Sequence, residues 1–285
     1  MRGETKIMNN ATPFVKLGGK LKVKSTHRTE FDLYPSPMNA TGEYRYKDAQ
    51  GGCEAKGFLY TWMISMSKVV SATKCCVVKH DIRTGELVGI SEEMELGHAN
   101  DATYNPDENT ILVSFCDGTT RMAVLDADTL QLKEVIELEG RWLCNIHYDP
   151  VSKIYVAVSV QCEDFYVYDK DFKLLNHFNG KMSHRYGRDY VMQGVIHDGV
   201  YAYVLEWHGG DSWVKTNTTI EEDARSSLRV YNLETGEFVD AIDLGIHVEI
   251  EYAVWWNQKF YFGCNNIRWN GLEVYEVEIT SAEND

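Results

Sequence analysis

A short turn motif recurs along the chain at a nearly constant spacing. It begins at Asp81 (DIRTGE), Asp126 (DADTLQ), Asp169 (DKDFKL) and Asn232 (NLETGE), and each copy follows an alternating run of apolar residues. A fifth run, LEVYEVE, places Glu276 at the corresponding position. These positions are 43 to 45 residues apart, except for 63 residues between Asp169 and Asn232. A period in the low forties that is built from strands and tight turns is typical of a β-propeller. We therefore predict an all-β fold of five blades, each with four antiparallel strands.

The whole chain, residues 1–285, is predicted to form this single domain. The predicted blades cover residues 50–97, 98–141, 142–181, 190–245 and 247–279. Blade 5 lacks an outer strand, and an unpaired rim strand would leave the ring open. The segment 13–25 has alternating apolar residues and belongs to no blade. We expect it to pair with GLEVYEVEI as the outer strand of blade 5 and so to close the ring.

The long interval reflects an insertion, residues 208–226, between the second and third strands of blade 4. In an antiparallel blade this loop lies at the end of the axis where the innermost strands begin, and the repeated turns lie at the other end. A polar loop of this length is usually functional or disordered. We interpret it as a lid over the axis, with Trp213 in contact with a ligand. A surface excursion without a function is the alternative.

Polar side chains stand near the start of the innermost strand in every blade. They are Gln50 in blade 1, His98, Asn100 and Asp101 in blade 2, Asn145 and His147 in blade 3, Gln193 in blade 4, and Glu249 and Glu251 in blade 5. Their convergence on one axis predicts a pocket that orients a small polar ligand. Two confined carboxyls, Asp101 and Glu251, would have separated pKa values and act as acid and base. The alternative is that these groups bind axial water or tie neighbouring blades together.

Neither a cofactor nor a bound metal is expected. The motif HAND, with His98 and Asp101, has ligand types that suit zinc or calcium. However, no pair of histidines has helical i, i+4 spacing, and successive residues of a strand point to opposite faces. The sequence also has no P-loop, no G-x-G-x-x-G motif and no G-x-S-x-G motif.

Charge and composition narrow the range of partners. The net charge of −15 argues against nucleic acid and against anionic membranes, and it is compatible with a cationic or neutral ligand. The N-terminal segment MRGETKIMNNATPFVKL has no apolar core of signal-peptide length, so we expect a cytoplasmic protein unless a leader has been removed. The seven cysteines are scattered and form no C-x-x-C pair, so buried, reduced thiols are expected.

Several of these stretches resemble known five-bladed propellers. The pairs Gln50-Gly51 and Gln193-Gly194, with HVEIEYAVWWNQKFYF in blade 5, resemble the plant-type glutaminyl cyclases, in which an axial pocket cyclises N-terminal glutamine. The same stretches, with GHANDATYNPDENTILVS, are similar to helveticin-J-like bacteriocin proteins in the order H-x-x-D/E, Q-G and H-x-E-x-E. The resemblance covers the blade layout from residue 50 to the end of the chain.

The resemblance to the cyclases carries over Gln50 and either Glu249 or Glu251 as site residues. It fails in blade 2, where Ala99-Asn100-Asp101 replaces the Glu-Gly-Leu that holds the cyclases' catalytic glutamate. It also fails in blade 3, where Cys144-Asn145-Ile146 replaces Trp-Gly-Leu. Glutamine cyclisation is therefore not the favoured activity, and the likeness to helveticin-J implies a fold and little mechanism.

From the sequence we expect a soluble propeller that binds a small amide, amino-acid or sugar-like ligand on its axis. Acid–base chemistry of the cyclotransferase, lyase or hydrolase type, without a metal, is the catalytic hypothesis. The alternative is a non-catalytic interaction or receptor-binding module of phage or bacteriocin type. A protein partner would then bind through the loop 208–226.

Overall fold

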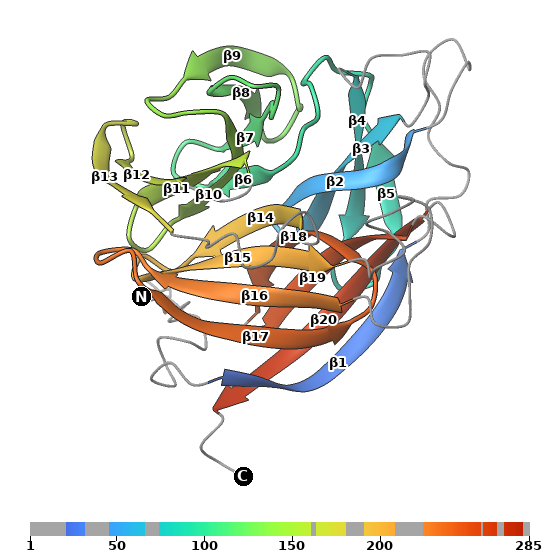
Figure 1. Cartoon of the computed structure of the whole chain (residues 1–285). Coiled ribbons are helices and arrows are strands. Elements are labelled where there is room, and N and C mark those ends of the chain that lie inside the picture. The colour runs from blue at the N-terminus through green and yellow to red at the C-terminus, as the bar shows by residue number, and fades with distance from the viewer. Residues whose placement is uncertain are drawn as a thin grey trace, which may run out of the picture.

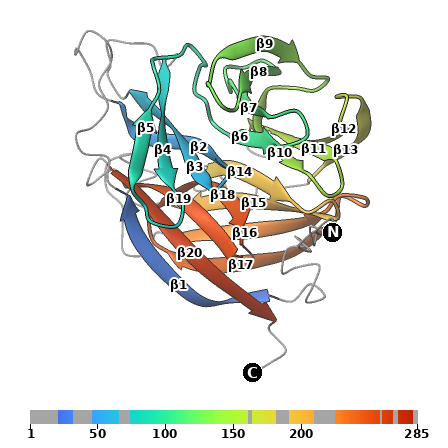
Figure 2. The same ribbon diagram turned by 180° about the vertical axis from the view of Figure 1, so that it is seen from behind.

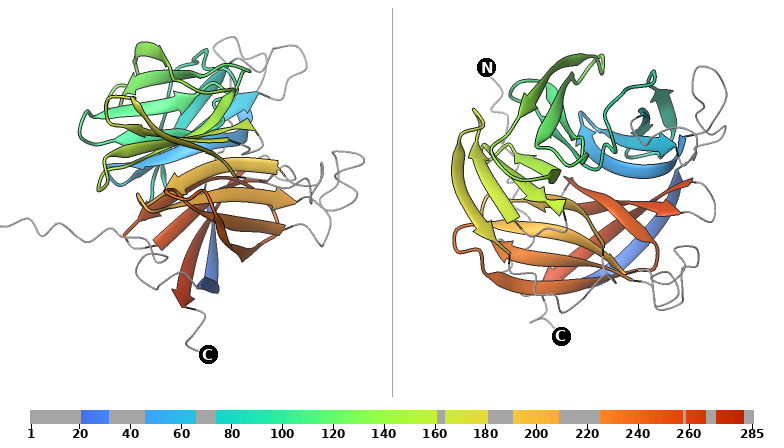
Figure 3. Two further views of the ribbon diagram at one scale, coloured as in Figure 1. Left: turned by 60° about the vertical axis from the view of Figure 1, so that its left-hand side comes forward. Right: turned by 45° about the horizontal axis from the view of Figure 1, so that its top comes forward.

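The computed structural model shows five separate four-stranded antiparallel sheets arranged around a common centre (Figure 1; Figure 3, right). It describes residues 21–31, 46–65, 74–160, 164–180, 191–208, 225–257, 259–266 and 271–281. The innermost strands of neighbouring sheets contact each other all the way around the ring. The fold is therefore the five-bladed β-propeller that the repeat predicts.

In each blade the strands run in order from the axis to the rim. Blade 1 contains β2 (Tyr46–Ala55), β3 (Phe58–Ser65), β4 (Cys75–Asp81) and β5 (Leu87–Ile90). Blade 2 contains β6 (Ala102–Asn105), β7 (Thr110–Ser114), β8 (Arg121–Asp126) and β9 (Leu132–Glu137). Blade 3 contains β10 (Leu143–Asp149), β11 (Ile154–Ser159), β12 (Asp164–Asp169) and β13 (Leu174–Asn179). Blade 4 contains β14 (Val191–His197), β15 (Tyr201–His208), β16 (Arg225–Asn232) and β17 (Phe238–Ile246). Blade 5 contains β18 (Glu249–Trp256), β19 (Lys259–Asn266), β20 (Gly271–Ser281) and, as its outer strand, β1 (Leu21–Phe31).

The core lies between the blades because every sheet is sandwiched between two neighbours. Strand β7 is buried along its whole length, so both of its faces pack against apolar side chains. The outer strands β5 and β13 alternate between half-buried and exposed positions, because only one of their faces is covered. Burial on both faces explains why the second and third strands have near-continuous apolar runs.

The repeated motif forms the turn between the third and fourth strands of blades 1 to 4. Asp81 Oδ1 accepts hydrogen bonds from the backbone N–H groups of Arg83 and Thr84, both at 2.9 Å. The acceptors Asp126, Asp169 and Asn232 are used in the same way. A side chain that caps the N–H groups two to four residues further on replaces backbone partners in a tight turn. The motif therefore recurs once per blade, because each of these turns needs a side chain that caps its N–H groups.

Glu276 does not belong to this series, which corrects the fifth position predicted from the sequence. It lies in the middle of β20, opposite Tyr261 on one side and His27 on the other. Blade 5 needs no such turn because its outer strand comes from the other end of the chain.

The N-terminal strand completes blade 5, as predicted. β1 pairs with β20 in antiparallel register from Leu21↔Ser281 to Phe31↔Leu272, with one irregularity after Val23 (Figures 1 and 2). The observed strand overlaps the predicted segment 13–25 at residues 21–25 and continues beyond it, and residues 13–20 lie outside the described part of the chain. Ring closure thus depends on both ends of the chain.

The axis of the propeller has two ends. The start face is the end where the innermost strands begin, near Asp48, Asn100, Asn145, Gln193 and Glu249. The turn face is the opposite end, where the innermost strands turn into the second strands and where the repeated motif lies.

Candidate functional site at the propeller axis

The innermost strands carry irregularities at the sequence-predicted polar positions. The register with the second strand shifts at Gln50-Gly51 in β2, at Cys144 in β10, at Gln193-Gly194 in β14 and at Glu251 in β18. In blade 2, the ladder begins only after Asn100 and Asp101. A β-bulge releases backbone groups from the ladder and re-aims side chains, and bulges are frequent next to active sites. Here the irregularities lie near the start face of the axis in blades 1, 3, 4 and 5.

One released backbone carbonyl joins three blades. The carbonyl oxygen of Gln193 accepts hydrogen bonds from Asn100 Nδ2 at 3.0 Å and from Asn145 Nδ2 at 2.5 Å. The side chain of Gln193 donates from Nε2 to Glu249 Oε1 at 2.7 Å. These contacts link blades 2, 3, 4 and 5, so four of the sequence-predicted residues belong to one buried network.

The carboxyl group of Asp101 is held in a second part of this network. Its Oδ2 accepts from the backbone N–H groups of Ile146 at 3.1 Å and Val195 at 3.4 Å, and Oδ1 accepts from Ala102 at 2.9 Å. Burial raises the pKa of Asp101 well above its usual value, and these three N–H groups lower it in part. With both oxygens occupied by the backbone of blades 2, 3 and 4, Asp101 is placed to position neighbouring strands. This is the inter-blade tie that the sequence left open as an alternative.

The two Gln-Gly pairs have a steric cause. A Cβ on Gly51 would lie 2.4 Å from Cα of Asp101, and the N–H of Gly51 donates to the carbonyl of Ala99 at 3.2 Å. A Cβ on Gly194 would lie 2.8 Å from the side chain of Leu205 and 3.2 Å from the carbonyl oxygen of Glu251. Glycine is therefore required because backbones of neighbouring blades meet at these points.

A group of carboxyls lies on the start face, where blades 5 and 1 adjoin. Asp48, Glu249 and Glu251 are all at least nine-tenths buried, and Glu251 is 1% exposed. Burial raises the pKa of Glu249 to about 7. Burial, followed by the charges of Glu249 and Asp48, raises the pKa of Glu251 well above its usual value. At neutral pH this group therefore holds protons that isolated carboxyls would have lost.

Glu251 is the member of the group whose hydrogen bonding is unsatisfied. Within the described part of the chain, no residue is in hydrogen-bonding geometry with Oε1 or Oε2 of Glu251, and the same holds for Oδ1 of Asn265. The amide of Asn265 still lies near enough to lower the pKa of Glu251 slightly. A buried polar atom without a partner costs about 1–3 kcal/mol, so three such acceptors side by side are unusual in a structural core.

The other sequence-predicted residues are more scattered. Gln50 is buried within its bulge in β2. His98 is half-buried, and burial lowers its pKa. His147 lies toward the turn face, where it lines a cavity with residues of the other blades. Trp213 and most of the insertion 208–226 lie outside the described residues, so its interpretation as a lid stays a prediction.

Asp48 and Asn265 were missed by the sequence analysis. Asp48 stands two residues before Gln50, in KDAQGG, and this carboxylate beside a Gln-Gly pair was a usable signal. Asn265 lies on the second strand of blade 5, beside Glu249 in the register, and no sequence pattern connects it to the axis.

Metal sites and membrane-spanning helices were sought over all the described residues. No three of their His, Cys, Asp or Glu side chains are grouped as a metal site would require. They also contain no helix long and apolar enough to cross a membrane.

One expectation about the cysteines is wrong. Cys116 and Cys144 form a disulfide bond between the second-to-third-strand loop of blade 2 and the first strand of blade 3. Cys53, Cys75, Cys76 and Cys264 are buried free thiols, as expected. The pairing was not visible in the sequence because the two residues are brought together by the packing of different blades.

Comparison with known proteins identifies no family for this chain. No protein-family model matches the sequence. No curated protein matches it either. Among solved structures, it is similar to a member of the DUF4221 family from Bacteroides vulgatus, with a TM-score of 0.49 and 10% identity, over 92% of this chain and 99% of that one. It is also similar to the hydrazine synthase of Kuenenia stuttgartiensis, with a TM-score of 0.40 and 15% identity, over 79% of this chain and 58% of that one.

These likenesses do not bear on function. The resemblance to helveticin-J-like proteins and to glutaminyl cyclases receives no specific support from the comparisons, and the five-bladed propeller is what is shown.

Proposed function

We propose that this propeller binds a small polar molecule with an amine or amide nitrogen at the start face of its axis. The observation that carries the proposal is the side chain of Glu251, which is 1% exposed and has two carboxyl oxygens without a hydrogen-bond partner among the described residues. The adjacent Oδ1 of Asn265 is a third buried acceptor in the same condition. A primary ammonium group has three donors and no acceptor, so it complements this set.

Charge supports the same ligand chemistry. The pKa of Glu251 is raised partly by the charges of Glu249 and Asp48, so all three groups act on one location. A positive charge placed there would favour the ionised carboxylates and would replace the protons that they hold. An anionic ligand would meet the opposite effect.

Proton transfer is the catalytic form of this proposal. Glu249, with a pKa of about 7, is partly ionised near neutral pH, which suits a general base. Glu251, whose pKa is also raised by burial, is the second group of the pair and would act as the acid when it is protonated. This pair replaces Asp101 and Glu251, because both oxygens of Asp101 are occupied by backbone N–H groups. Cyclotransferase, lyase and hydrolase reactions can all use such a pair.

The test is calorimetric titration with glycinamide and with glycolamide, which differ only in an amino group and a hydroxyl group. We expect glycinamide to bind at least about 10-fold more tightly, because one charge-assisted hydrogen bond is worth about 1.5–3 kcal/mol. Glu251→Gln should abolish this preference without lowering the melting temperature. Glu54→Gln is the matched control, because Glu54 is a half-buried glutamate with a raised pKa at the turn face.

Equal binding of the two amides, or glycinamide binding that is unchanged in Glu251→Gln, would contradict the proposal. The function to examine next would be the non-catalytic interaction module. It is favoured by the apolar side chains that the outer strands present to solvent, including Leu132 at 54%, Leu175 at 55% and Phe238 at 52% exposure. Large exposed apolar surfaces are typical of interaction sites, whereas single exposed side chains are common.

A further inference from the structure

A cavity of about 280 Å³ lies at the turn face, at the opposite end of the axis from the carboxyls of Asp48, Glu249 and Glu251. Its wall is formed by the innermost strands of all five blades and their turns, at Gly52–Glu54, Ala102–Tyr104, Pro106, His147–Pro150, Ile196–Asp198 and Ala253–Trp255. A concave site with an apolar wall and a few placed polar groups is the usual form of a small-molecule site. The function proposed above makes no use of this end of the axis.

His147 presents a hydrogen-bond donor to this cavity. Its Nδ1 accepts the backbone N–H of His197 at 3.2 Å. Burial, with a smaller contribution from His197, holds the pKa of His147 well below its usual value. A neutral imidazole whose Nδ1 is an acceptor carries its proton on Nε2. Because His147 lines the cavity and the backbone engages Nδ1, Nε2–H is the ring donor left for a ligand in the cavity.

His197 fixes this arrangement. Its Nδ1 accepts the N–H of Gly199 at 3.1 Å, so its Nε2 carries the proton and donates to the carbonyl oxygen of His147 at 3.1 Å. The two rings meet edge to face, with centroids 4.9 Å apart and planes at 87°. Two backbone contacts and one ring contact therefore hold both the orientation and the tautomer of His147, as a supporting residue does in a preorganised site.

The wall also carries acceptors that are held by their own turns. Glu54 Oε1 accepts the N–H of Gly57 at 2.6 Å, and Asp149 Oδ2 accepts the N–H of Ser152 at 2.7 Å. Each carboxyl keeps a second oxygen that has no hydrogen-bond partner among the described residues. A hydroxyl group of a ligand could donate to either one.

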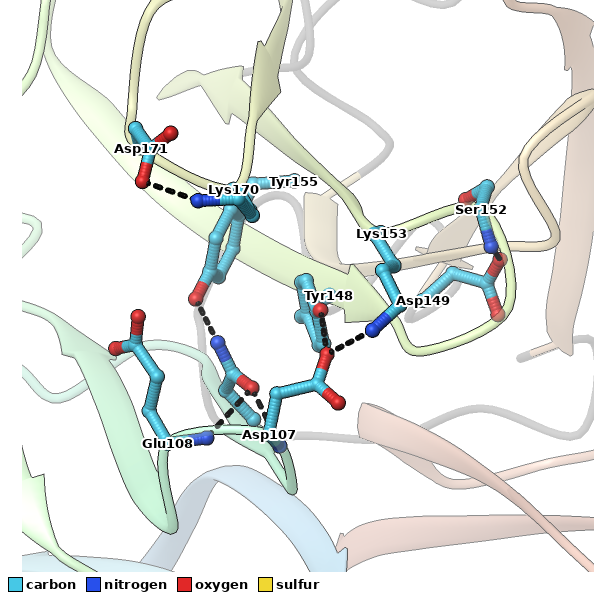
Figure 4. A network of polar contacts seen from close by, with 10 residues as sticks. Asp107, Glu108, Tyr148, Asp149, Ser152, Lys153, Tyr155, Lys170 and Asp171 are labelled. Carbon is cyan, nitrogen blue, oxygen red and sulfur yellow. Dashed lines mark hydrogen bonds and ion pairs between the residues drawn. The ribbon is translucent and has the colours of Figure 1, made fainter.

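Aromatic side chains supply the flat part of the wall. Tyr148 donates its hydroxyl proton to Asp107 at 2.7 Å, and Asp107 also pairs with Lys153 at 2.9 Å (Figure 4). The ring of Tyr148 is thus fixed at its polar end and is buried against Tyr155. The half-buried rings of Tyr104 and Trp255 are the aromatic surfaces that the wall offers to a ligand. Amphipathic rings of this kind bind molecules that have an apolar face and a polar edge.

We propose that this cavity is a second binding site, for an uncharged monosaccharide unit. A pyranose has ring faces for Tyr104 or Trp255, an oxygen that accepts from His147 Nε2, and hydroxyl groups that donate to Glu54 and Asp149. The carboxylates disfavour an anionic sugar, and the fixed N–H of His147 disfavours an ammonium group at the same position. The site shares no residue with the group of Asp48, Glu249 and Glu251 at the start face.

In the experiment the protein is titrated with three sugars that share one ring and differ in charge: glucose, glucosamine and glucuronate. We expect glucose to bind more tightly than glucuronate and to shift the ¹⁵N resonance of His147 Nε2. His147→Phe should weaken glucose binding by about 10-fold, since one hydrogen bond is lost, and His147→Gln should restore part of it through an amide N–H. His98→Phe is the matched control, because His98 is a half-buried histidine whose pKa is also lowered by burial and which does not line this cavity.

The proposal is overturned if glucose does not bind, if glucuronate binds as tightly, or if the His147 resonance is unchanged at saturation. If His147→Phe fails to fold, the resonance shift in the unmodified protein and the Gln variant decide the question. Glu251→Gln separates the two proposals. It should reduce glycinamide binding and leave glucose binding unchanged, so each site can fail without the other.

Discussion

The carboxyl groups at the axis have different hydrogen-bonding environments, although all of them lie near the start of an innermost strand. Asp101 is satisfied by three backbone N–H groups, Glu249 by one amide, and Glu251 by none that meets hydrogen-bonding geometry among the described residues. Sequence can indicate that acidic residues converge, but it cannot tell which of them the neighbouring backbone will satisfy. That distinction separates a residue that ties blades together from one that is available to a ligand.

Glu249 gives a pH-dependent prediction at this scale. Its pKa rises from 4.5 in the unfolded chain to about 7 in the fold, so the folded state holds the proton more tightly. Its contribution to stability is complete below pH 4.5 and is lost as the pH rises to about 7, by about 3 kcal/mol. Glu249→Gln should therefore lose less stability than the unmodified protein between pH 5 and pH 8. Urea unfolding at the two pH values measures the difference.

Comparing the two proteins cancels the contributions of groups that Glu249 does not influence. Glu251 is not one of them, because the charge of Glu249 raises its pKa. His147, whose pKa is lowered, destabilises the fold as the pH falls below about 6.5, and it does so in both proteins. If the two proteins lose equal stability between these pH values, Glu249 does not titrate as described.

At the level of single elements, the bulges in the innermost strands make the site. They allow the backbones of neighbouring blades to approach, and this approach requires glycine at Gly51. Gly51→Ala should destabilise the protein by about 1–3 kcal/mol, as overpacking does, because the new methyl group would press on backbone atoms of Asp101. Gly89→Ala is the control, since nothing lies within 4 Å of its Cβ position and its φ needs no glycine. Chemical unfolding of both variants tests this, and equal stabilities would contradict it.

The strands themselves were predictable from the sequence, whereas the bulges were not. Alternation and apolar runs indicate strands such as β7 and β15, because each strand has to bury its own faces. The turn motif at Asp81 is equally local, since the side chain caps its own turn. A bulge such as Gln193-Gly194 depends on the register with β15 and on contact with blade 5, and both are tertiary properties. Of the axial residues predicted from the sequence, four share one hydrogen-bonded network, whereas His147 lies toward the turn face. Asn265 and the disulfide partner of Cys116 were not found, because their contacts are tertiary too.

For the whole molecule, the closing strand determines whether there is an axis at all. β1 covers the exposed edge of β20 along its length, and Thr26 Oγ1 donates to the carbonyl oxygen of Leu244 in blade 4 at 3.3 Å. Through these contacts β1 completes blade 5 and joins it to its neighbour. Without it, β20 would present unpaired N–H and C=O groups at the rim, and the contacts between blades 4 and 5 would weaken.

Deleting residues 1–31 should therefore lower the melting temperature of the entire propeller rather than of blade 5 alone. All five blades share the hydrogen bonds around Gln193, Asp101 and Gly51, so loss of one edge propagates to the axis. Adding a synthetic peptide of residues 21–31 should restore part of the lost stability, and increasingly so at higher peptide concentration, because it binds only the folded ring. A peptide of the same composition in scrambled order is the control. An unchanged melting temperature after the deletion would contradict this prediction, because it would show that the propeller is equally stable without β1.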